Sequence, residues 1–135
     1  MTSPIIVGGV HHFTLTVTDL RRSVDFYGKV LGFEPVADLG TKIGLHNGSM
    51  LLLLSLAPDP GQAITNDRFN ENRIGLDHIS FKVDDHESMK KAAATLDSMG
   101  VPRGGIRDLG KGFGFYVMAF WDPDNIQLEM TALYD

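Results

Sequence analysis

Hydrophobic and polar residues alternate over residues 10–17 in a way that is typical of a strand with two different faces. The apolar members of the alternation share one face: Phe13, Leu15 and Val17. The polar members share the other: His12, Thr14 and Thr16. Because successive side chains of a strand point to opposite sides, we expect the first face to be buried and the second to form a polar surface.

The pattern changes to helical spacing over residues 20–31, where apolar side chains recur every three or four positions. Asp19 is placed to cap the start of this helix, and Gly32 is suited to end it in the left-handed conformation. Three short apolar segments then predict strands near 33–38, 42–46 and 49–56. The first half of the chain is therefore predicted to be a βαβββ unit.

The second half repeats this arrangement. Over residues 76–83 the polar positions are His78, Ser80 and Lys82, in phase with the first strand. A second helix follows, and Asp84 with Glu87 three residues later predicts a capping box at its start. Further strands are predicted near 101–107, 113–120 and 126–132, and the Pro and Asp residues of 121–125 predict a hairpin turn before the last one.

The near-repeat indicates two modules of a single domain spanning residues 1–135, a length that can bury a sizeable core. Module one spans about 8–57 and module two about 75–135. Between them, residues 58–74 form a connector that begins with Pro and Gly and ends in a polar run. A loop of this length in a compact domain is often functional or a crossover between modules.

Composition excludes several classes of function. The net charge is −5 and no segment concentrates Lys and Arg, which argues against nucleic-acid binding. The chain has no cysteine, so disulfides, thiolate metal sites and cysteine nucleophiles are excluded. No apolar run is long enough to span a membrane, and the N-terminus lacks the features of a signal peptide. We therefore expect a cytoplasmic protein whose partner is a small molecule rather than nucleic acid or membrane.

Three predicted strands carry, on their polar faces, residues of types that can bind metals: His12, His78 and Glu129. Two imidazoles and a carboxylate on rigid strands can hold a divalent ion and leave positions open for substrate. Iron, manganese, nickel, cobalt or zinc suits such nitrogen and oxygen ligands. A single histidine on a strand is more often an ordinary hydrogen-bonding residue, so the repetition of the position carries this prediction.

The segments VHHFTLTVTDLRRSVDFYGKVLGFE, GLDHISFKVDD and FWDPDNIQLEM resemble the vicinal oxygen chelate superfamily of glyoxalases, bleomycin resistance proteins and extradiol dioxygenases. The resemblance implies an α+β fold in which two tandem βαβββ modules form a curved mixed-sheet cup. It also implies a divalent metal held by His12, His78 and Glu129, with Glu129 the one candidate for a catalytic role. In this family the metal acts as a Lewis acid on two adjacent substrate oxygens.

Two departures bear on the subclass. Glyoxalase I and the related epimerase generally take a fourth ligand, Glu or Gln, from the last strand of module one. We expect Leu52 or Leu54 at that position here, and neither can bind metal or accept a proton. Extradiol dioxygenases and fosfomycin-resistance enzymes usually carry a Tyr ten residues before the glutamate, where this chain has Ala119.

The sequence therefore predicts a metal-dependent, dioxygenase- or lyase-like enzyme. Residues on the ligands' faces are the predicted polar substrate contacts: Thr14, Ser80 and Gln127. A second set forms either an apolar cavity wall or ordinary core: Leu52, Leu54, Phe113 and Phe115. The alternatives are a metal-free binding protein of the bleomycin-resistance type and a dimeric partner or regulatory module. Family members of this length are commonly homodimers, with the site formed within one chain or between two.

Overall fold

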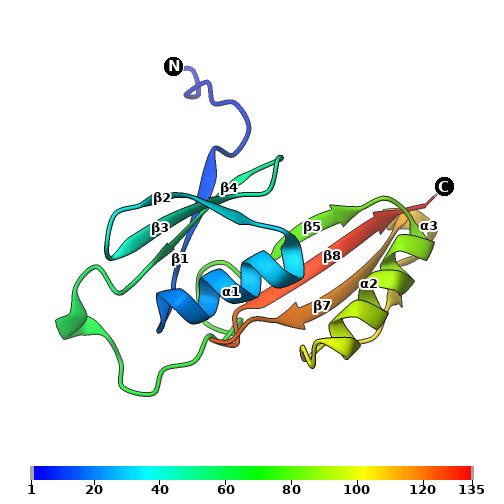
Figure 1. Ribbon diagram of the computed structural model, residues 1–135. Coiled ribbons are helices and arrows are strands. Elements are labelled where there is room, and N and C mark those ends of the chain that lie inside the picture. Colours follow the sequence, from blue (N-terminus) through cyan, green and yellow to red (C-terminus); the bar gives the residue numbers. More distant parts are fainter. Residues whose placement is uncertain (1, 135) are drawn as a thin grey trace. The chain divides into compact units, whose positions relative to one another are not determined.

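The computed structural model describes residues 2–134 and contains two βαβββ units in succession (Figure 1). The chain divides into two compact units, Met1–Ala63 and Ile64–Asp135, and the division falls within the predicted connector. Each unit has one long helix and a four-stranded mixed sheet, so the fold class is α+β, as predicted.

Unit one has four strands and one long helix, followed by a short 3₁₀ turn: β1 (His12–Thr16), α1 (Leu20–Leu31), β2 (Glu34–Asp38), β3 (Lys42–His46), β4 (Leu51–Ser55) and η1 (Pro60–Gln62). The strand order is β1-β4-β3-β2, in which β1 is parallel to β4 and the other pairs are antiparallel. Helix α1 packs against β3 and β4. As predicted, the Asp19 side chain caps its first turn, accepting from the backbone N–H of Arg22 at 3.0 Å, and Gly32 ends it with φ 73°.

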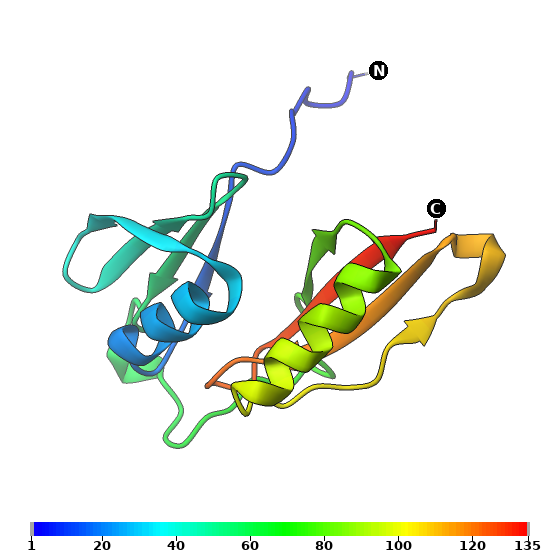
Figure 2. The same ribbon diagram turned by 45° about the vertical axis from the view of Figure 1, so that its right-hand side comes forward.

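Unit two repeats the order with one additional helical turn: β5 (Ile79–Val83), α2 (His86–Ser98), β6 (Arg107–Asp108), α3 (Gly110–Phe113), β7 (Phe115–Trp121) and β8 (Gln127–Leu133). Its strand order is β5-β8-β7-β6, with β5 parallel to β8. Helix α2 packs against β8, as the view in Figure 2 shows. The two units therefore share one topology.

Three local predictions for unit two differ from the structure. Asp85, not Asp84, caps α2, and its side chain accepts from the backbone N–H of Ser88 at 2.8 Å. The predicted strand 101–107 is reduced to β6 and an isolated bridge between Arg103 and Phe120, because Pro102 and two following glycines interrupt the ladder. The start of the predicted strand 113–120 is instead helix α3.

The turn between β7 and β8 is the predicted hairpin, and one carboxylate organises it. Buried Asp122 accepts two backbone hydrogen bonds at 2.8 Å on its Oδ1, from the N–H groups of Asp124 and Ile126. Asn125 takes a left-handed conformation, φ 64°. These contacts set the pairing of β7 with β8, so that Glu129 lies opposite Ala119.

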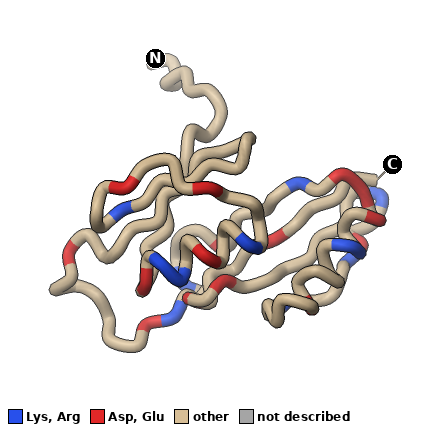
Figure 3. Tube along the Cα trace, in the orientation of Figure 1, with Lys and Arg blue, Asp and Glu red and all other residues tan. Residues whose placement is uncertain are grey.

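No helix within residues 2–134 is long and apolar enough to cross a membrane. Basic and acidic residues are interspersed along both units, without an extended basic segment (Figure 3).

Candidate functional site

In unit two the parallel pairing of β5 with β8 brings two predicted metal ligands together. Ser80 pairs with Glu129 in the ladder, and His78 stands two residues before Ser80, on the same face. The Nε2 atom of His78 lies 3.4 Å from Oε1 of Glu129. Both side chains keep an accessible surface, 34% for His78 and 18% for Glu129, so the two donor atoms are partly shielded but reachable.

Asp77 orients the His78 ring from the other side. Its Oδ1 lies 2.8 Å from Nδ1 of His78 and also accepts a 2.7 Å hydrogen bond from Nε2 of Gln127. A carboxylate oxygen accepts, so Nδ1 of His78 carries a proton, and in the neutral ring the lone pair is then on Nε2, which faces Glu129. Two electron-pair donors that face each other in this way are stabilised by a cation between them, either a proton or a metal ion. A metal-bound imidazole usually donates its other ring N–H to a carboxylate in this way, which fixes the orientation of the ring.

Hydroxyl groups complete the polar face around Glu129. Oγ1 of Thr131 donates to Oε1 of Glu129 at 3.5 Å, and Oγ of Ser80 is hydrogen-bonded to Oγ1 of Thr131. Glu129 pairs with Ala119 of the neighbouring strand β7. Of the predicted polar contacts, Ser80 and Gln127 therefore belong to the same cluster as His78 and Glu129.

The other predicted ligand, His12, lies in unit one at the start of β1. Its Nδ1 is 2.8 Å from Nδ1 of His11, and the two rings meet edge to face. The contact leaves Nε2 of His12 without a partner in that pair. Thr14 follows on the same face of β1. Among residues 2–134, no three or more His, Asp or Glu side chains are grouped closely enough to hold a metal ion.

Two of the four apolar residues predicted to form either a cavity wall or ordinary core lie in β4. Leu52 and Leu54 pair with Phe13 and Leu15 of β1 and are fully buried, so they belong to the core face of the sheet. The β4 residue that shares the face of His12 and Thr14 is Leu53, the partner of Thr14. Because Ser80 and Thr14 occupy matching places after the two histidines, Leu53 is the counterpart of Glu129.

Phe113 and Phe115 are separated by the end of α3. Phe113 is 71% exposed on that helix and meets Phe115 edge to face, with ring centroids 5.8 Å apart. Phe115 begins β7 opposite Leu133, on the face of Glu129 but four residues farther along β8.

Sequence reasoning missed the residues that contact the two histidines. Asp77 and His11 each immediately precede a predicted ligand, and each contacts its Nδ1 atom. Alternation places a preceding residue on the opposite face of a regular strand, which is why neither was predicted. His78 lies just before β5 and His12 opens β1, where the backbone is not constrained by a strand on both sides.

Comparison with known proteins gives a consistent result. A sequence model of the Glyoxalase/Bleomycin resistance protein/Dioxygenase superfamily matches residues 9–130. The uncharacterized protein YwkD of Bacillus subtilis (strain 168) is 30% identical over 136 residues, covering 93% of this chain and 98% of YwkD. A glyoxylase/bleomycin resistance protein/dioxygenase domain from Frankia sp. EAN1pec has a similar crystal structure, with a TM-score of 0.79 and 28% identity over 96% of this chain and 95% of that one.

A second solved structure shares the fold at lower identity. It is a mutant of the fosfomycin resistance protein FosX from Listeria monocytogenes, complexed with Mn(II) and 1S,2S-dihydroxypropylphosphonic acid. The TM-score is 0.70 at 19% identity, over 93% of this chain and 90% of the FosX chain.

Proposed function

The chain belongs to the Glyoxalase/Bleomycin resistance protein/Dioxygenase superfamily, and we propose that it is one of the metal-dependent enzymes of that group. In this proposal His12, His78 and Glu129 hold a divalent ion, one of iron, manganese, nickel, cobalt or zinc. A small substrate binds the ion through two adjacent oxygen atoms and undergoes a dioxygenase- or lyase-like step.

The single observation that carries the proposal is the His78–Glu129 pair with Asp77 behind it. At 3.4 Å, Nε2 and Oε1 can both reach one ion at ordinary bond lengths of about 2.0–2.2 Å. The donors are an imidazole nitrogen and a carboxylate oxygen, which suit the proposed metals. FosX of L. monocytogenes, which has the same fold, binds Mn(II), and this supports the choice of metal class.

A bound metal would supply Lewis-acid stabilisation of negative charge on substrate oxygens. The surrounding residues would hold the metal ligands in position and orient the substrate. Asp77 keeps the Nδ1 proton on His78, and Thr131 donates to Glu129, so both side chains are held in position before substrate arrives. Ser80 and Gln127 orient polar groups of the substrate, and Thr14 does so from unit one. In β4 the residue proposed to border the substrate is Leu53.

The test is the metal content per chain, measured by plasma mass spectrometry after anaerobic purification without chelator. The parent is compared with His78→Ala and Glu129→Ala, and His86→Ala serves as a histidine control, because His86 lies in the first turn of α2 and stacks on Tyr116. We expect near-stoichiometric metal in the parent and in the control, and loss in both site variants. A parent that stays empty after Fe(II), Mn(II), Ni(II), Co(II) and Zn(II) are added back would overturn the proposal and favour the metal-free binding protein.

We also propose that the protein is a homodimer, as expected for members of this length. Strands β1 and β5 are both edge strands of their own sheets, and an edge strand is where a strand of another chain can extend a sheet. Light scattering gives the mass in solution. Mixing His12→Ala with His78→Ala then tests where the site forms: mixed dimers regain one intact site if the ligands come from two chains, and regain none if they come from one.

A further inference from the structure

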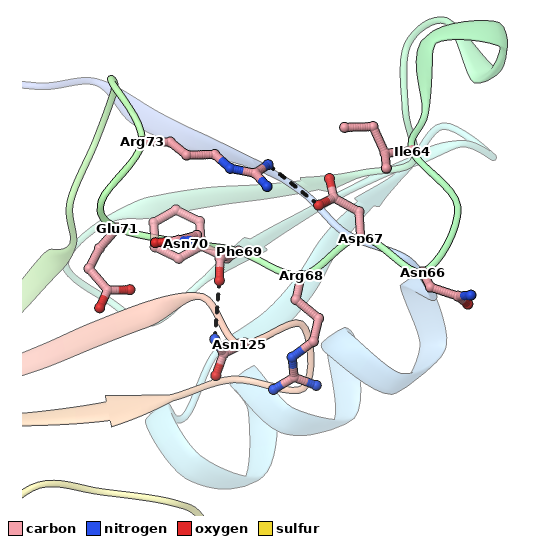
Figure 4. A pocket seen from close by; sticks show the side chains of 9 residues that line it. All are labelled: Ile64, Asn66, Asp67, Arg68, Phe69, Asn70, Glu71, Arg73 and Asn125. Carbon is pink, nitrogen blue, oxygen red and sulfur yellow. Dashed lines mark hydrogen bonds and ion pairs between the residues drawn. The ribbon is translucent and has the colours of Figure 1, made fainter.

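A pocket of about 510 Å³ lies in unit two, outside the His78–Glu129 pair, between the connector and the β7–β8 turn (Figure 4). Its lining comes from residues 64–73 and from Asn125. We call it the connector pocket. We propose that it binds a small organic carboxylate through Arg68, with the apolar part of the ligand against Phe69.

The connector is held in place on the turn by two hydrogen bonds. The backbone N–H of Phe69 donates to the carbonyl of Asp124 at 3.0 Å, and Nδ2 of Asn125 donates to the carbonyl of Phe69 at 3.1 Å. Asn125 is itself fixed in the left-handed conformation of the turn. Because the residue after Arg68 is anchored on both its N–H and its C=O, the base of the Arg68 side chain is fixed before any ligand binds.

Arg68 is the cation in this pocket that is free to bind an anion. Arg73 already pairs with Asp67, with Nη1 3.7 Å from Oδ1. Arg68 makes no hydrogen bond or ion pair with any other residue in the range 2–134, and in Figure 4 its side chain extends toward the side of the loop where Asn125 lies. A guanidinium fork matches a carboxylate in a bidentate geometry. The amide of Asn66, also without a partner within this range, supplies further donors in the same pocket.

The other charges of the pocket favour a ligand with one negative charge. Two arginines, Arg68 and Arg73, balance two acids, Asp67 and Glu71, so the lining as a whole is neutral. Glu71 has no cationic partner within residues 2–134 and extends away from Arg68 in Figure 4. A phosphate dianion therefore meets more repulsion than a carboxylate does. Half-buried Phe69 and exposed Ile64 add an apolar surface for a ring or alkyl chain.

The test is a titration of the metal-free, ¹⁵N-labelled chain with sodium benzoate at low, constant ionic strength, followed by amide chemical shifts. We expect saturable shifts confined to residues 64–73 and 124–126, with a dissociation constant on the order of a millimolar, as suits an exposed charge pair. Phenyl phosphate should bind more weakly, and benzyl alcohol, which lacks the charge, should give no saturable shift.

Matched variants separate recognition by Arg68 from general attraction to positive charge. Arg68→Gln should weaken benzoate binding about tenfold, and Arg68→Lys, which keeps the charge but not the fork, should lie between it and the parent. The control Arg21→Gln removes an exposed arginine of α1 and should stay within about twofold of the parent. Benzoate binding that is equal in Arg68→Gln and the parent, or shifts spread over the whole surface, would overturn the proposal. Because the titration uses metal-free protein, its outcome is independent of the metal test above.

Discussion

The two βαβββ units share a topology but differ at one matched position that bears on chemistry. In unit two the parallel ladder pairs Ser80 with Glu129, and in unit one it pairs Thr14 with Leu53. Each unit thus has a histidine at or just before the start of its first strand and a hydroxyl residue two positions later, but only unit two adds a carboxylate from its last strand. The matched position of the duplicated framework therefore holds a carboxylate in unit two and a leucine in unit one.

The residues that contact Nδ1 of the two histidines also differ between the units. Asp77 is an anion that fixes the tautomer of His78, whereas His11 is a second imidazole that can either donate to or accept from His12. Unit two is therefore better prepared to hold a cation than unit one. In the function proposed above, unit two supplies two of the three metal ligands and unit one supplies His12.

The largest effect expected from this comparison concerns the two faces of β4. Leu52 is fully buried on the core face, so Leu52→Ala should lower the free energy of unfolding by about 2–5 kcal/mol. Leu53 is half-buried on the face of His12, and Leu53→Ala should cost only about 1 kcal/mol. Urea unfolding of both variants measures the difference. Equal losses would contradict the assignment of Leu53 as the counterpart of Glu129.

A smaller effect is expected from the residues behind the histidines. If Asp77 orients His78 toward a metal, Asp77→Asn should weaken metal affinity by about 10–100-fold, as is typical of residues that hydrogen-bond to a metal ligand. His11→Ala, the matched change in unit one, should have a smaller effect. Asp84→Asn removes an exposed carboxylate close in sequence and should leave the affinity unchanged. Competition with a fluorescent chelator gives all four affinities, and a larger loss in His11→Ala than in Asp77→Asn would reverse our ranking of the two units.

The smallest effect on stability concerns a contact that is found near the end of unit two. The hydroxyl of Tyr134 donates to Asp108, and this hydrogen bond raises the pKa of Tyr134 to about 12 and lowers the pKa of Asp108. The stabilisation from the tyrosine is present below its ordinary pKa of about 10 and is lost as the pH rises from there through 12. The stabilisation from Asp108 is present above its ordinary pKa of 3.8 and is lost as the pH falls through its lowered value.

Tyrosinate absorbance checks this contact directly. The step near pH 12 should disappear in Tyr134→Phe and move toward pH 10 in Asp108→Asn, because the amide carries no negative charge. A titration curve of Asp108→Asn that matches the parent would show that the carboxylate has no influence on the phenol.

Much of this fold could be predicted from the sequence, because strands such as β1 and β8 alternate cleanly between apolar and polar residues. Which face of the sheet each residue of β4 occupies could not be predicted. Its residues are four consecutive leucines and a serine, which carry no alternation, so only the pairing with β1 shows that Leu53 shares the face of His12. Helix α3 was missed because a glycine-rich segment has no apolar stripe. Asp84 and Asp85 are equally good caps by composition, and backbone geometry selects the second.

Part of the candidate site could also be predicted from alternation along the strands, and part could not. His78, Glu129, Ser80 and Gln127 could be grouped from their shared phase, and the structure places them together. The roles of Asp77 and Arg68 depend on where irregular backbone directs a side chain, which periodicity does not report. Loop residues such as Arg68 acquire their surroundings only from contacts distant in the sequence, here those with the β7–β8 turn.

The β7–β8 turn that Asp122 organises limits which insertions and deletions the protein can tolerate. Because strand side chains alternate, a change of one residue between Asp122 and Ile126 would shift β8 by one position and turn Glu129 toward the core. The segment from 57 to 63 lies before the anchored part of the connector, and there the cost of extra residues grows only slowly with length. Length variation among homologues should therefore accumulate in that segment, and the spacing from Asp122 to Glu129 should stay constant.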